Sequence, residues 1–203
     1  MKKAVFVDRD GTLNKMVYDQ THGLMDSPRR PEQVELIPGA GRFLKEVRLQ
    51  GYLAVVVSNQ PGLTKGTLTL DELNAVHRQL AELLLGEGGA WDDLYYAAYH
   101  PEGGPGACRA YEAQKEFRKP APGMLLDAAK KHDIDLAGSW MVGDGIVDVQ
   151  AGRAAGCRTV LVTQLKLEQL EQFQKLEDAT PDAVVADLAE AFTIIQRGEV
   201  PRH

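Results

Sequence analysis

Several side chains that could carry out phosphoryl transfer lie just beyond short apolar runs of this sequence. They are the carboxylates of Asp8, Asp10 and Asp144, the hydroxyl of Ser58 and the ammonium of Lys119. A carboxylate can attack phosphorus and form a covalent aspartyl phosphate, and a hydroxyl or an ammonium can stabilise charge on the phosphoryl oxygens. These residue types therefore point to covalent phosphoryl transfer, provided that the fold brings them together.

Each of these residues has an expected role in that chemistry. Asp8 is the expected nucleophile, Lys119 would neutralise charge on the phosphoryl group, and Ser58 would donate a hydrogen bond to it. Asp10 lies two positions beyond Asp8 in an extended turn, so it can face the leaving group, protonate the departing alkoxide and then activate water. An aspartate in that place predicts hydrolysis rather than storage of the phosphoryl enzyme.

A divalent cation is expected beside the nucleophile, because an anionic carboxylate and a phosphate ester repel each other. Mg²⁺ prefers hard oxygen ligands, and Asp8, Asp144 and the backbone carbonyl of Asp10 could supply them. Asp148 lies four residues beyond Asp144, at an expected helix start. We expect Asp148 to stand behind the metal ligands and to hold a water molecule or Lys119.

The elements that position these residues are predicted from an alternation of short apolar runs and helical patterns. The predicted strands carry few charges, as is typical of strands buried on both faces of a sheet. We expect strands at residues 4–7, 53–57, 94–98, 140–142, 159–162 and 183–185, and helices at residues 70–84, 122–132, 147–155, 166–176 and 188–196. This order predicts an α/β fold, with a doubly wound, Rossmann-like parallel sheet and helices on both faces. Ligands of such sheets bind at the carboxyl ends of the strands.

Two stretches interrupt the alternation, residues 14–38 and residues 99–118. Both contain several Gly and Pro residues, which is typical of loops, and each begins near the carboxyl end of a predicted strand. We therefore expect both loops to border the site. Neither is long enough to be a separate domain, so we expect residues 1–203 to form a single domain without a separate cap domain.

Some basic side chains near the predicted site have more than one interpretation. Four basic residues of the two loops either hold a second phosphate of the substrate or are ordinary solvated charges, namely Arg29, Arg30, Arg109 and Lys115. His77 lies on the leucine-rich helix predicted at residues 70–84. We expect His77 to lie at the protein surface.

The composition argues against several other classes of protein. The chain has 23 basic and 29 acidic side chains, a net charge of −6, which argues against a nucleic-acid partner. Its two cysteines are too few for a disulfide framework or a four-thiolate zinc site. The N-terminal apolar run is too short for a signal peptide, and no stretch approaches the roughly 20 apolar residues of a membrane span. We therefore expect a cytoplasmic protein with no membrane partner, and its oligomeric state is left open.

The motifs resemble those of the haloacid-dehalogenase-like (HAD) superfamily of Mg²⁺-dependent phosphohydrolases. Within it, the sequence is similar to the D,D-heptose 1,7-bisphosphate 7-phosphatases and to the histidinol-phosphate phosphatases. The resemblance covers roughly residues 3–163. It is carried by Asp8-Arg9-Asp10-Gly11-Thr12-Leu13-Asn14, Ser58-Asn59-Gln60-Pro61-Gly62, Arg118-Lys119-Pro120-Ala121-Pro122-Gly123-Met124 and Val142-Gly143-Asp144.

The resemblance implies a Mg²⁺-dependent phosphatase that acts on a small phosphorylated sugar. D-glycero-D-manno-heptose 1,7-bisphosphate is the first candidate substrate, and histidinol-phosphate phosphatase is the alternative activity. Nucleic-acid 3′-phosphatases share part of the Lys119 motif, but the net charge of −6 argues against that activity.

The resemblance also implies roles for residues next to the motif centres. Arg118 is expected to contact the substrate, and Asn59 and Gln60 lie in the segment that contacts the substrate in the family. Gly145 occupies a position at which the family often has a lysine that touches the substrate. We therefore include Gly145 among the predicted substrate-binding positions, with the reservation that its missing ammonium weakens the case for a bisphosphate.

The family commonly has a structural zinc site in the loop before the Arg-Lys-Pro motif. The ligand positions are occupied here by Ala97, Tyr99, Lys115 and Phe117. None of these is Cys or His, the ligands of most structural zinc sites. We therefore expect Mg²⁺ as the cofactor and no structural zinc, with the loop held by packing of Tyr99 and Phe117.

Overall fold

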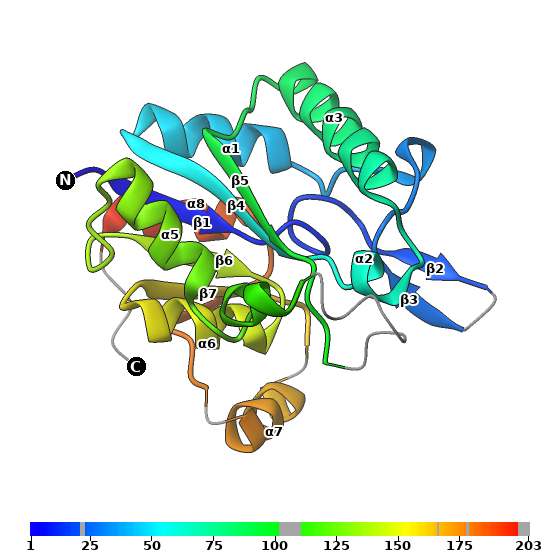
Figure 1. Ribbon diagram of the computed structural model, residues 1–203. Coiled ribbons are helices and arrows are strands. Elements are labelled where there is room, and N and C mark those ends of the chain that lie inside the picture. The colour runs from blue at the N-terminus through cyan, green and yellow to red at the C-terminus, as the bar shows by residue number, and fades with distance from the viewer. Residues whose placement is uncertain (21–22, 102–110, 166, 178, 199–203) are drawn as a thin grey trace.

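A six-stranded parallel sheet forms the centre of the computed structural model, which describes residues 1–20, 23–101, 111–165, 167–177 and 179–198 (Figure 1). In spatial order its strands are β5 (Asp93–Ala97), β4 (Tyr52–Asn59), β1 (Lys3–Val7), β6 (Trp140–Gly143), β7 (Arg158–Val162) and β8 (Ala183–Val185). Every predicted strand is present, with small shifts at the ends. The predicted α/β architecture with a parallel sheet is confirmed.

Helices cover both faces of this sheet (Figure 1). One face is covered by α1 (Ala40–Leu49), α3 (Leu70–Gly86) and α8 (Leu188–Arg197), whose apolar residues share one core cluster. The other face is covered by α5 (Gly123–His132) and α6 (Ile146–Ala155), which share a second cluster, and α7 (Leu167–Glu177) packs beside α6. All predicted helices are present, so the two-layered covering of the sheet agrees with the prediction.

The central strand β1 is buried from both sides. Val5 and Val7 belong to the core cluster of α1, α3 and α8, whereas Ala4 and Phe6 belong to the cluster of α5 and α6. All four side chains are completely buried, and burial of a large apolar side chain contributes about 1.5–3 kcal/mol. The end of β1, where the first motif begins, is therefore held in place by packing on two faces.

Helix α1 and the position of His77 differ from the prediction. The residues of α1 were not predicted to be helical, although Phe43, Leu44 and Val47 recur at helical spacing and are buried in the core. His77 lies on α3 with only 9% of its surface exposed, so its predicted position at the surface is wrong. Its side chain contacts Arg9 of the first motif. A local helical pattern could not reveal this contact, because the two residues are far apart in the sequence.

The first predicted loop contains regular structure. Within residues 14–38 the chain forms an antiparallel hairpin of β2 (Val17–Asp19) and β3 (Leu24–Asp26), followed by a 3-10 helix, η1 (Pro31–Gln33). The hairpin projects beyond the large sheet (Figure 1), and in the described part of the chain the two sheets share no strand pairing. This segment is therefore a two-stranded sheet beside the large one, and the prediction of a single domain without a cap stays a prediction.

The second predicted loop is only partly described. Residues 102–110, with Arg109, lie outside the described residues, and a 3-10 helix, η2 (Glu112–Phe117), leads into Lys119. A short helix, α2 (Gly62–Lys65), follows β4. None of the helices that the structure describes combines the length and the apolar character needed to cross a bilayer.

Candidate active site

Strand register brings three of the motif residues to one edge of the sheet. β1 pairs in parallel with both β4 and β6, and Val7 lies level with Val142 of β6. Asp8 follows Val7, and its backbone N–H donates to the carbonyl of Val142 at 2.9 Å. Ser58 lies near the end of β4, and Asp144 follows β6. The carboxyl ends of three neighbouring strands thus deliver these side chains to one place, as the sequence predicts.

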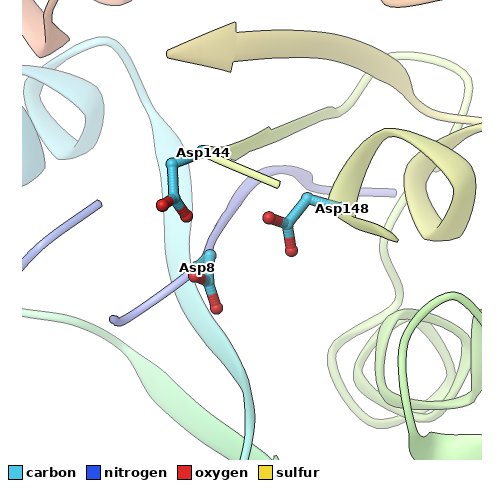
Figure 2. Close-up of side chains that lie close together, drawn as sticks. All are labelled: Asp8, Asp144 and Asp148. Atoms are coloured by element: carbon cyan, nitrogen blue, oxygen red, sulfur yellow. The ribbon is translucent and has the colours of Figure 1, made fainter. Parts of the chain in front are cut away.

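Three carboxylates point toward one another at this edge, those of Asp8, Asp144 and Asp148 (Figure 2). Each offers an oxygen within 4.8 Å of the other two. Asp148 comes from the first turn of α6, where its Oδ2 accepts the backbone N–H of Gly145 at 3.0 Å. Asp8 and Asp148 are buried, whereas Asp144 is exposed. The cluster is therefore open to solvent at Asp144.

Lys119 lies against this cluster. Its Nζ is 2.5 Å from Oδ1 of Asp8 and 2.6 Å from Oδ1 of Asp148, and it donates to the carbonyl of Val57 at 2.9 Å. Burial disfavours the charged amine, but the carboxylates of Asp148 and Asp8 outweigh it and raise the pKa of Lys119. The side chain is a fixed cation between the two buried aspartates.

One ammonium does not balance three carboxylates. Burial raises the pKa of Asp8 well above its ordinary value, and the charges of Asp148 and Asp144 add to this while Lys119 opposes it. Asp144 keeps part of its surface in water, yet desolvation and the charge of Asp148 raise its pKa to about 6. A divalent cation would neutralise the surplus charge, and this all-oxygen donor set suits Mg²⁺.

Two glycines, which have no side chains, make room for the carboxylates of Asp144 and Asp148. Gly11 has φ +89°, and a Cβ there would lie 2.1 Å from Oδ2 of Asp144. A Cβ on Gly143 would lie 2.3 Å from Oδ2 of Asp148. A left-handed turn without a side chain is therefore needed at Gly11, and the carboxylates can approach one another only because both positions are glycine. This arrangement fits a bound cation.

The side chains of Asn59 and Gln60 are used within the protein. The Asn59 amide donates to the carbonyl of Lys119 and accepts its backbone N–H, each at 3.0 Å. Gln60 Nε2 donates to Oδ2 of Asp10 at 2.7 Å and to Oγ of Ser58 at 2.8 Å, and Gln60 is 1% exposed. These contacts assign both residues to orienting catalytic groups, and the predicted contact with substrate remains a prediction.

Asp10 lies on the other side of Asp8 and is held by a set of donors. Arg9 Nη2 donates to both carboxylate oxygens, at 2.8 and 2.7 Å. Asn14 Nδ2 donates to Oδ1 and Ser27 Oγ to Oδ2, each at 3.0 Å, and Gln60 adds the bond described above. Burial opposes ionisation, but the charge and hydrogen bonds of Arg9, with the amide donors, hold the pKa of Asp10 below its ordinary value. Asp10 is a carboxylate in this state.

Four residues of the Asp10 environment were not singled out from the sequence. Arg9 and Asn14 belong to the first motif, so their position was a usable signal. Ser27 and His77 reach the site from the hairpin and from α3, and no local pattern marks them. Long-range contacts therefore contribute the part of the site that sequence spacing does not reveal.

Comparisons with known proteins agree with this geometry. A family model described as HAD-hydrolase-like matches residues 116–191. The D-glycero-D-manno-heptose-1,7-bisphosphate 7-phosphatase of Thermosynechococcus vestitus is 35% identical over 204 residues, covering 99% of this chain and 99% of that protein. The D-glycero-beta-D-manno-heptose-1,7-bisphosphate 7-phosphatase of Pasteurella multocida is 38% identical over 163 residues, covering 80% and 82%. The chain belongs to the HAD-like phosphatase family.

A solved structure of this family has the same fold. The crystal structure of D,D-heptose 1,7-bisphosphate phosphatase from B. bronchiseptica, complexed with magnesium and phosphate, gives a TM-score of 0.75 at 29% identity. The match covers 97% of this chain and 99% of that one. The present HAD-like phosphatase is therefore a hydrolase of phosphate monoesters. Its acidic cluster lies at the carboxyl edge of the parallel sheet.

Two predicted substrate contacts of this HAD-like phosphatase lie at the edge of the cluster. Arg118 is half-buried, and its Nη1 donates to the carbonyl of Tyr99 at 3.3 Å. Gly145 is the residue before α6, and its backbone N–H is used by Asp148. Neither contact tests binding of substrate, so both assignments remain predictions.

The positions of the zinc ligands in related HAD-like phosphatases are partly described. Ala97 is completely buried, and Phe117 packs against the same core cluster. Packing thus holds the base of this loop, although residues 102–110 lie outside the described residues. The absence of a structural zinc remains a prediction.

A cavity of about 400 Å³ shares Ser27 with the surroundings of Asp10. It is lined by the hairpin, by η1 and by the first turn of α3, and Ser27 belongs both to its wall and to the partners of Asp10. Arg29 forms ion pairs with Asp26 and, at 3.5 Å, with Asp19. Arg30 is exposed and also lines the cavity. The cavity is thus polar and carries charges of both signs.

Proposed function

We propose that this HAD-like phosphatase hydrolyses D-glycero-D-manno-heptose 1,7-bisphosphate at its 7-phosphate, with Mg²⁺ as its cofactor. The carrying observation is the cluster of Asp8, Asp144, Asp148 and Lys119 at the carboxyl edge of the sheet. It occurs in a chain whose relatives over most of its length bear the name of that activity. The preferred anomer is left to experiment.

The cluster supplies the groups for the first half-reaction. Asp8 attacks phosphorus and forms the aspartyl phosphate, while Lys119 and Ser58 stabilise the phosphoryl oxygens. Asp8, Asp144 and the backbone carbonyl of Asp10 would hold Mg²⁺. When bound, Mg²⁺ supplies a positive charge that offsets the repulsion between nucleophile and ester. Asp148 acts through Lys119, whose ammonium it fixes at 2.6 Å.

Asp10 supplies the proton transfers. It gives a proton to the departing alkoxide and, as a carboxylate, takes one from the water that attacks the aspartyl phosphate. The structure has Asp10 in the carboxylate form, held by Arg9, Asn14, Ser27 and Gln60. That form is the one needed for activation of water in the second half-reaction.

The cavity that shares Ser27 with the Asp10 environment is the proposed place for the rest of the substrate. The hydroxyl-rich body of the substrate would meet the polar wall. Arg30 of that wall, and Arg118 outside it, are the cations that would approach the second phosphate. Arg29 is already engaged by two carboxylates, so it would take part only if those ion pairs were exchanged. These cations would replace the lysine that related enzymes often have where this chain has Gly145.

The test is release of phosphate from the heptose bisphosphate in the presence of Mg²⁺, with the released position identified by phosphorus NMR. We expect loss of the 7-phosphate and dependence on Mg²⁺. Substitution Asp8→Asn removes the nucleophile and should lower kcat by at least about 10⁴-fold. Wild-type protein that releases no phosphate from any sugar phosphate would refute the proposed function.

A matched control is Asp127→Asn. Asp127 is exposed in α5 and belongs neither to the acidic cluster nor to the cavity wall, so the substitution removes the same charge away from both. Its kcat should equal that of the wild type. An equal loss in both variants would show that net charge, and not the nucleophile, governs the rate.

Histidinol phosphate is the second candidate substrate, and one observation favours it. The cavity wall contains Asp19, Asp26 and Glu72 against Arg29 and Arg30, so carboxylates outnumber guanidiniums there. A wall of that charge would suit a leaving group with a cationic amine. The ratio of kcat/KM for the two substrates, measured side by side, decides between them.

Two further expectations accompany this function. We propose that residues 1–203 fold as one domain, which limited proteolysis would test by the absence of a stable fragment. The cytoplasmic location inferred from the sequence is tested by cell fractionation. The oligomeric state is left to measurement of the molar mass in solution.

A further inference from the structure

Arg9 is the least expected charge in the site. It stands between Asp8 and Asp10 in the chain, and its side chain is completely buried. Its Nε donates to Oδ1 of Asp10 at 3.0 Å, and its Nη2 donates to both carboxylate oxygens. A buried guanidinium is costly unless its donors are satisfied. The Nε and Nη2 groups, one edge of the planar guanidinium fork of Arg9, thus have Asp10 as their acceptor.

His77 satisfies the other side of the fork. The Nη1 of Arg9 and the Nε2 of His77 are 2.9 Å apart, across 68 positions of sequence. A guanidinium has no acceptor, so Arg9 donates and His77 must carry its proton on Nδ1. Burial and the charge of Arg9 lower the pKa of His77 to about 3, which keeps the ring neutral. Because His77 is neutral, it accepts a hydrogen bond from the guanidinium and leaves Asp10 as the anion paired with Arg9.

The partners of Asp10 differ in what they can fix. Asn14, Ser27 and Gln60 each donate one hydrogen bond from a neutral group to one carboxylate oxygen. Single bonds of this kind allow the carboxylate to rotate. The planar fork of Arg9 contacts both oxygens at once and so fixes the plane of the carboxylate. The orientation of Asp10 therefore depends chiefly on Arg9, and that of Arg9 on His77.

We propose that Arg9, braced by His77 of α3, is a positioning residue that aims the Asp10 carboxyl group for both of its proton transfers. This inference rests on the proposed function. In the first transfer the bond from Asp8 oxygen to phosphorus forms, the ester P–O bond breaks, and the departing oxygen takes the proton of Asp10. In the second, Asp10 takes a proton from water as the water oxygen bonds to phosphorus and the bond to Asp8 breaks, and this is the proton that Asp10 gives to the leaving oxygen in the next turnover.

Leaving groups of different acidity separate the two transfers. A p-nitrophenolate ion leaves without a proton, whereas a sugar alkoxide needs one. If the Asp10 carboxyl group is wrongly oriented, the rate of the first half-reaction of p-nitrophenyl phosphate should therefore change little. The rate of the second half-reaction, in which Asp10 takes a proton from water, should fall. With an alkyl phosphate the first half-reaction itself should be slow.

The main variant is His77→Leu, which removes the acceptor and keeps every group that touches substrate. With p-nitrophenyl phosphate and Mg²⁺ we expect a rapid burst of about one p-nitrophenolate per active site, followed by slow turnover. With the heptose bisphosphate we expect no burst and a kcat lower by about 10- to 100-fold, with little change in KM. His77→Gln, which restores an acceptor, should recover most of this loss.

The control is His132→Leu. His132 ends α5 and contacts Asp93 at 2.7 Å, at the amino end of β5 and away from the site. We expect wild-type kinetics from it. If His77→Leu does not fold, as judged by circular dichroism, Arg9→Lys, which keeps the charge and loses the fork, is tested for the same burst.

The possible outcomes separate the inference from the proposed function. If the variants lower the rates with both esters by one common factor and without a burst, the role of His77 and Arg9 is structural and the inference is wrong. Wild-type behaviour of His77→Leu would also overturn it. If wild-type protein releases phosphate from neither ester, the proposed function fails, and the inference fails with it.

Discussion

The two sides of Asp8 differ in how they handle charge. On the metal side, defined by Asp144, Asp148 and Lys119, Asp8 brings the number of carboxylates to three beside a single ammonium, and the pKa values of Asp8 and Asp144 are raised. On the leaving-group side, defined by Asp10 and its donors, the guanidinium of Arg9 holds the pKa of Asp10 down. The metal side thus depends on a bound cation for neutrality, whereas the leaving-group side is neutralised by the protein itself.

Among changes to the surroundings of Asp8, the largest expected effect is on the metal side. Substitution Lys119→Met leaves three carboxylates without their ammonium and removes a donor to the phosphoryl oxygens. We expect kcat to fall by about 10²- to 10³-fold. Steady-state kinetics at saturating Mg²⁺ measure it. Lys130→Met, at an exposed lysine of α5, is the matched control, and equal activity of both variants would contradict the proposed role.

A smaller effect is expected from the space beside Asp144. A Cβ in Gly11→Ala would collide with the Asp144 carboxylate, so we expect Mg²⁺ affinity to fall by about 10- to 100-fold. Positive φ should add about 1–3 kcal/mol of destabilisation. Gly39→Ala is the control, because Gly39 has φ +81° and no atom within 4 Å of a Cβ. If Gly39→Ala weakens Mg²⁺ binding equally, backbone strain rather than the clash is responsible.

The leaving-group side is tested by the pH dependence of stability. The pKa of His77 is about 3 in the folded protein against an ordinary value of 6.5. The unfolded chain therefore binds a proton that the folded chain refuses, and this contribution to stability is lost as the pH falls from 6.5 toward 3. The free energy of unfolding should fall from pH 7 to pH 5 in both proteins. The fall should be smaller in His77→Gln than in the wild type, by about 1–2 kcal/mol.

Urea unfolding at both pH values measures this difference, with the change in wild type as the reference. The titrations of Asp8, Asp10 and Asp144 are common to both proteins and cancel to first order. Parallel pH dependence in the two proteins would mean that His77 is charged in the folded state, contrary to its burial beside Arg9.

The smallest effect is expected at the cavity. Arg30 is exposed, so its attraction for a second phosphate is screened. We expect Arg30→Gln to raise KM for the heptose bisphosphate by about two- to fivefold, with kcat unchanged. KM for p-nitrophenyl phosphate should not change. Arg42→Gln, an exposed arginine of α1, is the control, and the same rise in KM there would indicate a general effect of charge.

The metal side could be predicted from the sequence because its geometry is set by strand ends. Asp8 and Asp144 each follow a buried strand directly, and parallel pairing of β1 with β6 brings them together. Asp148 follows on the first turn of α6, at a fixed spacing. Local spacing and one rule of sheet topology are sufficient here. The six strands were predictable for the same reason, since burial on both faces leaves short apolar runs.

The leaving-group side could not be predicted in the same way. The contact of Arg9 with His77 spans 68 positions, and Ser27 reaches Asp10 from a hairpin that was expected to be a loop. The expected surface position of His77 followed from treating a polar residue on an apolar helix as solvated. Its actual burial depends on a partner that only the folded chain brings near. The available signal in the sequence was Arg9, whose place between Asp8 and Asp10 in the first motif marked it as a possible partner of Asp10.

Among the residues that the structure describes, the hairpin of β2 and β3 forms a sheet of its own, and its strands pair only with each other. Its sequence can therefore change without breaking a rung of the six-stranded ladder that sets the positions of Asp8 and Asp144. A lineage could thus exchange the hairpin to acquire a new substrate while inheriting the reaction unaltered. Under the proposed function, chimeras that swap residues 17–26 between relatives should therefore change the preferred substrate and keep the reaction.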